Sequence, residues 1–311
     1  MSHFVVVVGA SFAGLSAAMQ LARARQRVLL IDSGRPRNRF AATVHGFLGQ
    51  DGQSPQVIRD EALRQLLDYP TVEFVQGEVV SARPVDAGFA VLLADGREER
   101  AVRLILATGL RDELPAIPGL PERWGRTVLH CPYCHGYEVR DRSLGVLATM
   151  SLSAHQAGMI PDWGPTVYFT QGLHEPDAEQ LAHLQARGVR IERTPVVELL
   201  GQAPALEAVR LSDGRVIKVQ ALFTGPKTQM ASPLAEQLGC LFDEGPQGAY
   251  IRVDERKETS VPGVFAAGDA ASPMHNATFA AAAGVMAGFA VHQSLIAETS
   301  AHQKNMGTRS A

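Results

Sequence analysis

Residues 4–14 read FVVVVGASFAG, a short apolar strand that runs straight into a glycine-rich turn. The Ala-rich residues 15–25 predict a helix, and residues 28–31 (VLLI) predict a second buried strand that ends on Asp32. Strand, turn, helix, strand and acid in this order form the dinucleotide-binding pattern, in which the helix N-terminus binds a pyrophosphate and the acid binds a ribose. The pattern predicts a parallel α/β sheet with a nucleotide at its carboxyl edge.

The turn departs from the usual pattern at one position. Ser11 stands where a glycine normally lets the backbone approach the pyrophosphate. Serine is small, so we interpret the change as tolerated, although a generic strand-turn-helix without a ligand remains the alternative for this segment alone. The candidate contacts here are Gly9, Ser11, Ala13, Gly14 and Asp32.

Two further strands favour a nucleotide site. Residues 104–109 (LILATG) and 261–269 (VPGVFAAGD) each predict a buried strand, ending in Thr-Gly and Gly-Asp respectively. Both segments resemble the second and third FAD motifs of the two-dinucleotide-domain flavoprotein disulfide reductases. The resemblance implies FAD as the cofactor. The contacts that it implies are Ala107, Thr108, Gly109, Asp269 on the ribityl chain, and Asn276 and Ala277 at the flavin pyrimidine.

Residues 129–138 (LHCPYCHGYE) carry two thiols, Cys131 and Cys134. Two cysteines spaced in this way at the start of a helix can close a small disulfide, and a helix N-terminus favours the thiolate. His130 and His135 flank the pair and are candidate proton carriers. A zinc site and two inert cysteines are the alternatives. Zinc usually takes four ligands, and the chain holds no second C-x-x-C or H-x-x-H.

Over residues 3–297 the chain resembles the low-molecular-weight thioredoxin reductases. The resemblance implies an α/β fold of two Rossmann-like three-layer domains, the second inserted into the first. It also implies that Cys134 faces the flavin, that Cys131 exchanges with substrate, and that His135 replaces the family's acid as proton carrier. A homodimer is expected on the same ground. Two more candidate cofactor contacts are His45 and Val79.

Pro/Gly-rich stretches at residues 109–121 and 245–248 predict the two crossings between the domains. The expected domains are a discontinuous FAD-binding domain over residues 1–113 and 245–298, an inserted dithiol domain of degenerate NADPH type over residues 114–244, and a flexible tail over residues 299–311.

The inserted domain departs from the reductases at its own nucleotide turn. Residues 144–147 predict a strand, but Ala148-Thr149-Met150 follows where glycines or near-glycines belong. Met150 would place a long side chain where a pyrophosphate must touch the backbone. The reductases also carry an Arg pair for the 2′-phosphate after the next strand, where this chain reads QGLH at residues 171–174. We therefore predict that NADPH does not bind.

The altered turn, together with residues 131–138 (CPYCHGYE) and 32–38 (DSGRPRN), resembles the FAD-dependent dithiol oxidases that close disulfides in holomycin, gliotoxin and romidepsin. The resemblance implies an FAD-dependent thiol–disulfide oxidoreductase that oxidises a dithiol and passes the electrons to O2. One alternative is a thioredoxin-disulfide reductase that uses NADPH atypically, or ferredoxin or another flavin as donor. Another is a non-catalytic FAD-binding redox sensor. The thiol partner is a small dithiol or a thioredoxin-like protein.

Composition sets the remaining expectations. A formal net charge of −3 without a Lys/Arg cluster argues against a nucleic-acid partner. No run approaches the roughly 18 consecutive apolar residues of a membrane span, and residues 1–3 lack the positive start of a signal peptide. On these grounds we expect a cytoplasmic protein that does not bind a membrane. Three cysteines in such a chain do not make a disulfide framework, which favours a catalytic or metal-binding C-x-x-C pair, and we expect no metal site because a full ligand set is lacking.

Overall fold

The computed structural model of the chain describes residues 3–307 and divides into two compact units. Unit 1 comprises Met1–Arg37, Gln56–Arg111 and Gln229–Ala311, and unit 2 comprises Asn38–Pro55 and Asp112–Thr228. The chain crosses between the units along β7 (Leu110–Glu113) and β16 (Lys227–Met230), which pair as a two-stranded sheet. Each unit is built on its own sheet with a set of parallel strands and with helices, so the predicted α/β fold class is confirmed.

The unit boundaries differ from the predicted domain ranges at two places. Residues 38–55, which we assigned to the FAD domain, fall in unit 2, and residues 229–244, which we assigned to the inserted domain, fall in unit 1. Helix α7 (Ala277–Gly307) also continues into the predicted flexible tail, whose residues 308–311 lie outside the described part of the chain. Glycine and proline mark turns but do not show which unit a segment packs against. This explains why residues 38–55 and 229–244 were assigned to the other unit.

Unit 1 is built on a seven-stranded sheet with the order β3-β2-β1-β6-β5-β4, in which β19 also pairs with β6. Its strands are β1 (His3–Val8), β2 (Val28–Asp32), β3 (Val72–Gln76), β4 (Val79–Val85), β5 (Gly88–Leu93), β6 (Glu98–Leu106) and β19 (Val264–Ala266). The strands β3, β2, β1, β6 and β19 are parallel, so their carboxyl ends meet at one edge. The predicted nucleotide motifs follow three of these ends.

The two faces of this sheet carry separate cores, as the alternation along β1 requires. Val5 and Val7 pack in one cluster with residues of α1 (Phe12–Arg23) and α7, whereas Val6 and Val8 pack in another with residues of β4, β5 and α6 (Leu234–Gln237). The remaining elements of the unit are α2 (Pro55–Leu67), β17 (Phe242–Glu244), β18 (Ala249–Ile251) and η5 (Asp269–Ala271). The short helix η1 (Arg37–Phe40) begins at the last residue of the first segment of unit 1 and continues into unit 2.

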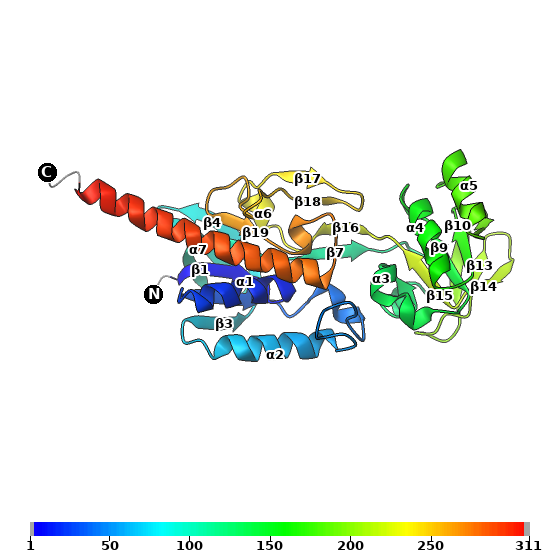
Figure 1. Cartoon of the computed structure of the whole chain (residues 1–311), viewed down its shortest axis with the longest axis horizontal. Helices are drawn as coiled ribbons and strands as arrows, with labels where there is room; N and C mark the ends of the chain where they lie inside the picture. The colour runs from blue at the N-terminus through cyan, green and yellow to red at the C-terminus, as the bar shows by residue number, and fades with distance from the viewer. Residues whose placement is uncertain (1–2, 308–311) are drawn as a thin grey trace. The chain divides into compact units, whose positions relative to one another are not determined.

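Helix α7 packs along α1, as Figure 1 shows. Two glycines permit the approach, because a Cβ at Gly284 would lie 2.0 Å from the Ala13 carbonyl oxygen and one at Gly288 would lie 2.8 Å from that of Ala17. The 22 residues Ala277–Glu298 are also long and apolar enough to cross a membrane, by length and composition only. A helix that covers the core of a globular domain meets the same test, so the test alone assigns no span.

Unit 2 contains a five-stranded parallel sheet with the order β11-β10-β9-β15-β8 and a three-stranded antiparallel sheet with the order β12-β13-β14. The strands are β8 (Val128–Leu129), β9 (Leu144–Leu147), β10 (Thr166–Phe169), β11 (Arg190–Glu192), β12 (Val196–Leu200), β13 (Ala208–Leu211), β14 (Val216–Lys218) and β15 (Ala221–Thr224). The helices are η2 (Pro121–Arg123), α3 (Pro132–His135), η3 (Tyr137–Val139), α4 (Ser153–Met159), η4 (Ile160–Asp162) and α5 (Ala178–Ala186).

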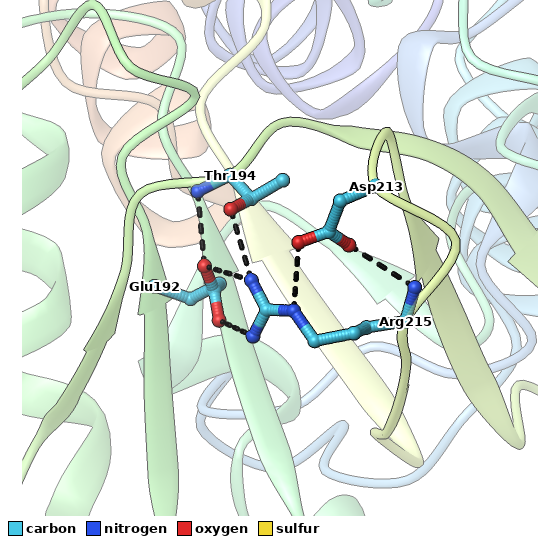
Figure 2. Close-up of polar contacts among 4 residues, drawn as sticks. All are labelled: Glu192, Thr194, Asp213 and Arg215. Atoms are coloured by element: carbon cyan, nitrogen blue, oxygen red, sulfur yellow. Dashed lines mark hydrogen bonds and ion pairs between the residues drawn. The ribbon is translucent and has the colours of Figure 1, made fainter.

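An arginine joins the two sheets of unit 2. Figure 2 shows Arg215, in the turn between β13 and β14, held between Asp213 and Glu192 at the end of β11. Its guanidinium donates to Glu192 at 2.7 and 3.1 Å and to Asp213 at 2.7 Å. It also donates to the Thr194 hydroxyl at 2.9 Å, and the Thr194 N–H donates to Glu192 at 3.0 Å. The Arg215 hydrogen bonds lower the pKa of Glu192 to about 2. The edge of the parallel sheet is therefore tied to the hairpin by a charged, bidentate contact.

We expect Arg215→Met to lower the thermal stability of the protein near neutral pH, because Glu192 loses its bidentate charged partner and keeps the Thr194 N–H. The folded-state pKa of Glu192 lies below its ordinary value of 4.5, so the contribution is complete above that value and is lost as the pH falls toward about 2. Thermal unfolding across this pH range should show the difference between variant and wild type shrinking toward zero.

The matched control for this prediction is Arg252→Met. Arg252 forms an ion pair with Asp243 in which both side chains are more than a third exposed, so its loss should leave the melting temperature nearly unchanged. Equal effects of the two substitutions, or a difference that does not depend on pH, would contradict the role given to Arg215.

Candidate active site

The first glycine-rich turn folds as the sequence predicts, and its glycines are required by close backbone contacts. Gly9 has a φ of +105°, and a Cβ there would lie 2.3 Å from the Ala107 carbonyl oxygen. A Cβ at Gly14 would lie 1.7 Å from the Gly9 carbonyl oxygen. The carboxyl end of β6 closes on the same turn, since the Ala107 N–H donates to the Val8 carbonyl at 2.9 Å. The structure therefore brings the first two FAD motifs together.

Asp32, at the end of β2, is held by three donors. The N–H groups of Ala10 and Gly34 donate to its carboxylate at 2.9 and 3.0 Å, and the Arg59 guanidinium donates at 3.0 Å. Arg59, from α2, also donates to the Ala10 carbonyl oxygen at 3.0 Å. One arginine thus links the glycine turn to the predicted ribose acid. Sequence reasoning missed Arg59, because its position on α2 matches no spacing of the motif.

Asp269, at the start of η5, pairs with Arg37 at 2.9 Å, and both side chains are largely buried. Asn276, also predicted at the site, caps α7 by accepting the Thr278 N–H at 2.7 Å, and Ala277 is the first residue of that helix. The structure therefore places the acid and the helix start of the third motif in unit 1, together with an arginine that the sequence did not indicate.

The other predicted cofactor contacts lie in different parts of the fold. Thr108 and Gly109 follow the carboxyl end of β6, and Gly109 has a φ of +68°. Val79, in contrast, is buried in the core at the start of β4, where it pairs with Leu93. His45 lies in unit 2. Contact of Val79 and His45 with a cofactor stays a prediction.

The unit 1 turn fits a dinucleotide. Ser11 stands in extended conformation before α1, and its side chain forms no capping hydrogen bond with the helix. Backbone N–H groups at such a helix start bind a pyrophosphate, and the positive end of the helix dipole adds to the attraction. Asp32 lies at the end of the next strand, as the ribose contact requires. The residues present are therefore those that an FAD would need.

Replacing Arg59 with methionine should weaken FAD binding about tenfold, since Asp32 loses its charged partner and the Ala10 carbonyl loses a donor. Fluorescence titration of the apoprotein with FAD measures the change in Kd. Arg64→Met on the same helix is the control, because Arg64 is exposed and pairs only with exposed acids, Glu61 and Asp68, on its own helix or just past its end. An unchanged Kd in the Arg59 variant would remove it from the site.

The dithiol lies at the start of α3, immediately after β8. Cys131 and Cys134 form a disulfide with a Cα–Cα distance of 5.3 Å. Cys131 is the N-cap residue, Pro132 occupies the first helical position, and the Cys134 N–H lies 3.1 Å from the Cys131 sulfur. This N–H would stabilise a thiolate on Cys131 after reduction. The predicted redox pair is thus in disulfide geometry, with an amide directed at one sulfur.

Aromatic residues surround the helix that carries the disulfide. Tyr133, between the two cysteines, is 76% exposed and meets Trp163 edge-to-face at a centroid distance of 5.8 Å. Trp163 packs so closely on the helix end that a Cβ at Gly136 would lie 2.8 Å from its ring. Trp163 therefore fixes α3 from one side and leaves Tyr133 accessible.

His135, next to Cys134, lies with His45 and Glu138 in unit 2. The two imidazole centroids are 6.4 Å apart in an edge-to-face arrangement, and His45 Nε2 is 3.5 Å from a Glu138 carboxylate oxygen. Burial lowers the pKa of His135, while Glu138 raises it and His45 lowers it. His135 is accordingly favoured in the neutral form, in which it can accept a proton from a thiol.

In the glycine-free turn after β9, two backbone N–H groups donate to a side chain of the protein itself. The buried Ser153 hydroxyl oxygen accepts the N–H groups of Thr149 and Met150 at 3.1 and 3.3 Å, and the Thr149 hydroxyl donates to the Gly225 carbonyl at 2.5 Å. In the corresponding turn of unit 1 the Ser11 side chain forms no such bond, and the acceptor for the Ala10 N–H is the Asp32 carboxylate. Sequence reasoning found the altered turn but missed Ser153, which does the capping.

The altered turn and the dithiol share one edge of the unit 2 sheet. β9, β15 and β8 are adjacent and parallel, so the turn after β9 and the disulfide after β8 both follow carboxyl ends. Gln156, on α4, donates to the His130 carbonyl oxygen at 2.8 Å and so connects the helix after the turn with the residue before Cys131. Among residues 3–307 no group of three or more His, Cys, Asp or Glu side chains is arranged to hold a metal ion.

A family model of the pyridine nucleotide-disulphide oxidoreductases matches residues 3–147 and 168–284. The chain belongs to this family. The match and the disulfide geometry make it a thioredoxin reductase-like FAD-dependent oxidoreductase that acts on thiols and disulfides. Residues 148–167, which contain the altered turn, lie between the two matched segments.

Individual family members cover almost the whole chain. Thioredoxin reductase sirT of Leptosphaeria maculans is 31% identical over 96% of both chains. The crystal structure of an oxidoreductase from Agrobacterium tumefaciens is 50% identical, with a TM-score of 0.91 over 95% of this chain and 99% of that one. The crystal structure of HlmI is 38% identical, with a TM-score of 0.91 over 99% and 97% of the two chains. The expected family and its two-domain fold are thereby confirmed.

Proposed function

We propose that this chain is an FAD-dependent dithiol oxidase that uses O2 as electron acceptor and does not use NADPH. The observation that carries the proposal is the Ser153 hydroxyl, which accepts two N–H groups of the turn after β9. In a dinucleotide site such N–H groups bind the pyrophosphate, and here they already have an acceptor. The Met150 side chain adds bulk at the same turn. The unit 1 turn, in which the Ser11 side chain forms no cap, keeps the glycines and the acid of a dinucleotide site.

The charges around the second nucleotide position also support the loss of NADPH. Glu175 lies in the loop after β10, accepts the Thr170 hydroxyl at 2.8 Å and pairs with Arg193 at 3.0 Å. Arg215 is likewise engaged by Glu192 and Asp213. A 2′-phosphate would meet carboxylates and arginines that are already paired, which costs desolvation without a new ion pair. The likeness to HlmI at 38% identity supports the narrower resemblance to dithiol oxidases.

The proposed reaction moves two electrons from a substrate dithiol to the protein disulfide. One substrate thiolate attacks the Cys131 sulfur, the Cys131–Cys134 bond breaks, and Cys134 leaves as a thiolate, while His135 takes the substrate proton. The second substrate thiol then attacks the mixed disulfide and releases Cys131, whose thiolate accepts the Cys134 N–H. Bound FAD supplies the two-electron acceptor for the reduced pair, and O2 takes the electrons as H2O2.

An anaerobic absorbance titration of the purified holoprotein tests the proposal. Dithiothreitol should bleach the flavin, and air should restore its absorbance with formation of H2O2. NADPH, added in the same excess, should leave the flavin oxidised. Stoichiometric bleaching by NADPH within seconds would overturn the loss of the NADPH site.

A thioredoxin reductase is the second candidate function, and the curated relatives favour it. Both sirT and tcpT of Claviceps purpurea, 32% identical over 94% of each chain, carry that name. A reductase would accept electrons from NADPH in an atypical mode, or from ferredoxin or another flavin. A redox sensor, the third candidate, would show no thiol turnover in air. The same titration, extended with reduced ferredoxin and with a turnover assay, distinguishes the three.

We further propose that the protein works as a cytoplasmic homodimer on a small dithiol or a thioredoxin-like protein. Family likeness supports the dimer and the thiol substrate. Light scattering coupled to size-exclusion chromatography would give the oligomeric state of the holoprotein. Oxidation assays with a small dithiol and with reduced thioredoxin, each followed by H2O2 release, would separate the two substrate classes.

A further inference from the structure

The loop that follows η1 places a second histidine beside the dithiol helix. Val44 and Gln53 form an isolated bridge that closes the loop, with the Val44 N–H donating to the Gln53 carbonyl at 2.8 Å. Inside the loop the Gly46 N–H donates to the Asp51 carboxylate at 2.8 Å. The closed loop holds His45 so that only 18% of its side chain is exposed.

His45 lies between two carboxylates. Its Nδ1 is 3.5 Å from an Asp51 oxygen of the same loop, and its Nε2 is 3.5 Å from a Glu138 oxygen of η3. The Thr43 hydroxyl lies 3.0 Å from Nε2. Both ring nitrogens therefore face oxygen atoms, and a protonated His45 would be an ion-pair partner of both acids.

Two charged groups act on His135, and they act in opposite directions. Glu138, three residues along the chain, favours the protonated imidazole, and His45, at a centroid distance of 6.4 Å, favours the neutral one. His45 and Glu138 also contact each other, so a change in either alters the charge that the other presents. The groups that face the two histidines are thus Asp51 and Thr43 from the loop and Glu138 from η3.

We propose that His45 and Glu138 are positioning residues for thiol exchange, which set the protonation state in which His135 receives the proton of the attacking thiol. The inference rests on the proposed role of His135 in that exchange and assigns His45 to the dithiol rather than to the cofactor. In the exchange a substrate S–H proton passes to His135 while the new S–S bond forms at Cys131 and the bond to Cys134 breaks. The electron pair of the broken S–S bond stays on Cys134, which leaves as a thiolate, so this step needs no further oxidant.

The test is the pH dependence of disulfide reduction by dithiothreitol in two isosteric variants of the holoprotein. Rapid acid quench, alkylation and intact-mass analysis count the free thiols at each time without reference to the flavin colour. Glu138→Gln should shift the ascending limb of the pH–rate profile to lower pH, because His135 loses the carboxylate that raises its pKa. His45→Gln should move it to higher pH, because the electrostatic effect by which His45 lowers the pKa of His135 is removed. Each shift should be roughly half a pH unit, or about threefold in rate on the limb.

Three comparisons keep the test specific. Glu179→Gln, an exposed acid on α5, should leave the profile unchanged. Asp51→Asn should move the limb in the same direction as His45→Gln, because it removes one of the two acids that face His45. The Asp51 side chain is 71% exposed, so the variant should fold. The ionisation of dithiothreitol itself is the same in every sample and cancels.

Opposite shifts in the Glu138 and His45 variants support the inference. Unchanged profiles in both, or shifts in the same direction, overturn it. Because the exchange involves neither NADPH nor O2, this result is independent of the oxidase proposal. Opposite shifts together with flavin bleaching by NADPH would mean that the protein is a reductase in which His45 and Glu138 have the positioning role. Unchanged profiles together with H2O2 release would keep the oxidase and remove only the positioning role.

Discussion

Replacing Cys134 with serine is expected to lower dithiol turnover by at least about a thousandfold, because the disulfide that accepts the substrate electrons can no longer form. Cys131→Ser should have an equal effect, since both sulfurs belong to one bond. The fold of unit 2 should survive, because both side chains are only half-buried and the helix begins at Pro132. Turnover of a dithiol in air, measured as H2O2 release, gives the result.

Cys240→Ala is the matched control for the cysteine variants. Cys240 is the free cysteine of the chain; it is buried in unit 1, burial raises its pKa, and its neighbour is the Thr259 hydroxyl at 3.6 Å. A buried thiol of this kind packs as an apolar side chain and takes no part in exchange. Turnover should therefore remain near the wild-type rate. Retention of more than a few per cent of turnover in Cys134→Ser would place the redox chemistry elsewhere.

Gly14→Ala is expected to destabilise unit 1 by about 3 kcal/mol or more and to abolish FAD retention. Its Cβ would lie 1.7 Å from the Gly9 carbonyl oxygen and 2.9 Å from the carbonyl carbon. These are backbone atoms of the turn that meets α1, so relief requires the turn and the helix to separate. The same movement would open the backbone that a pyrophosphate must contact. The measurements are the FAD content of the purified protein and its thermal unfolding.

Gly77→Ala is the control for the glycine prediction. The backbone of Gly77 is not in the left-handed region. A Cβ added there would lie 3.2 Å from its nearest neighbour, the end of the Leu93 side chain. A flexible side chain can move by the few tenths of an ångström required, so FAD content and stability should change little. A Gly14 variant that retains FAD and wild-type stability would show that the turn is wider than its contacts indicate.

The first nucleotide turn was predictable because its determinants lie close together in sequence. The apolar run before Gly9 and the acid at Asp32 predict β1, the turn and β2, and the structure has these elements at His3–Val8 and Val28–Asp32. The dithiol followed for the same reason: Cys131 and Cys134 are three positions apart at a helix start, and they form the disulfide. Local spacing is sufficient where the chemistry is local.

The segment 38–55 was not predictable in the same way. Its sequence carries turn residues but no strong periodicity, and we assigned it with its sequence neighbours to the FAD domain. By its contacts it belongs to unit 2, where it brings His45 to Glu138. The prediction for His45 as a cofactor contact rested on resemblance, and its contacts within unit 2 are the basis of the role in thiol exchange that we propose for it.

The sequence by itself determined the family, the two α/β units, the first FAD turn and the redox disulfide, because each depends on periodicity, glycine positions or cysteine spacing within a short segment. Only the tertiary structure decided which groups complete these sites. Arg59 reaches Asp32 from another helix, Arg37 pairs with Asp269, and Ser153 caps the second turn from the helix that follows it. Hydrogen bonds and ion pairs depend on where side chains meet in space, and spacing along the chain does not fix that for residues on separate elements.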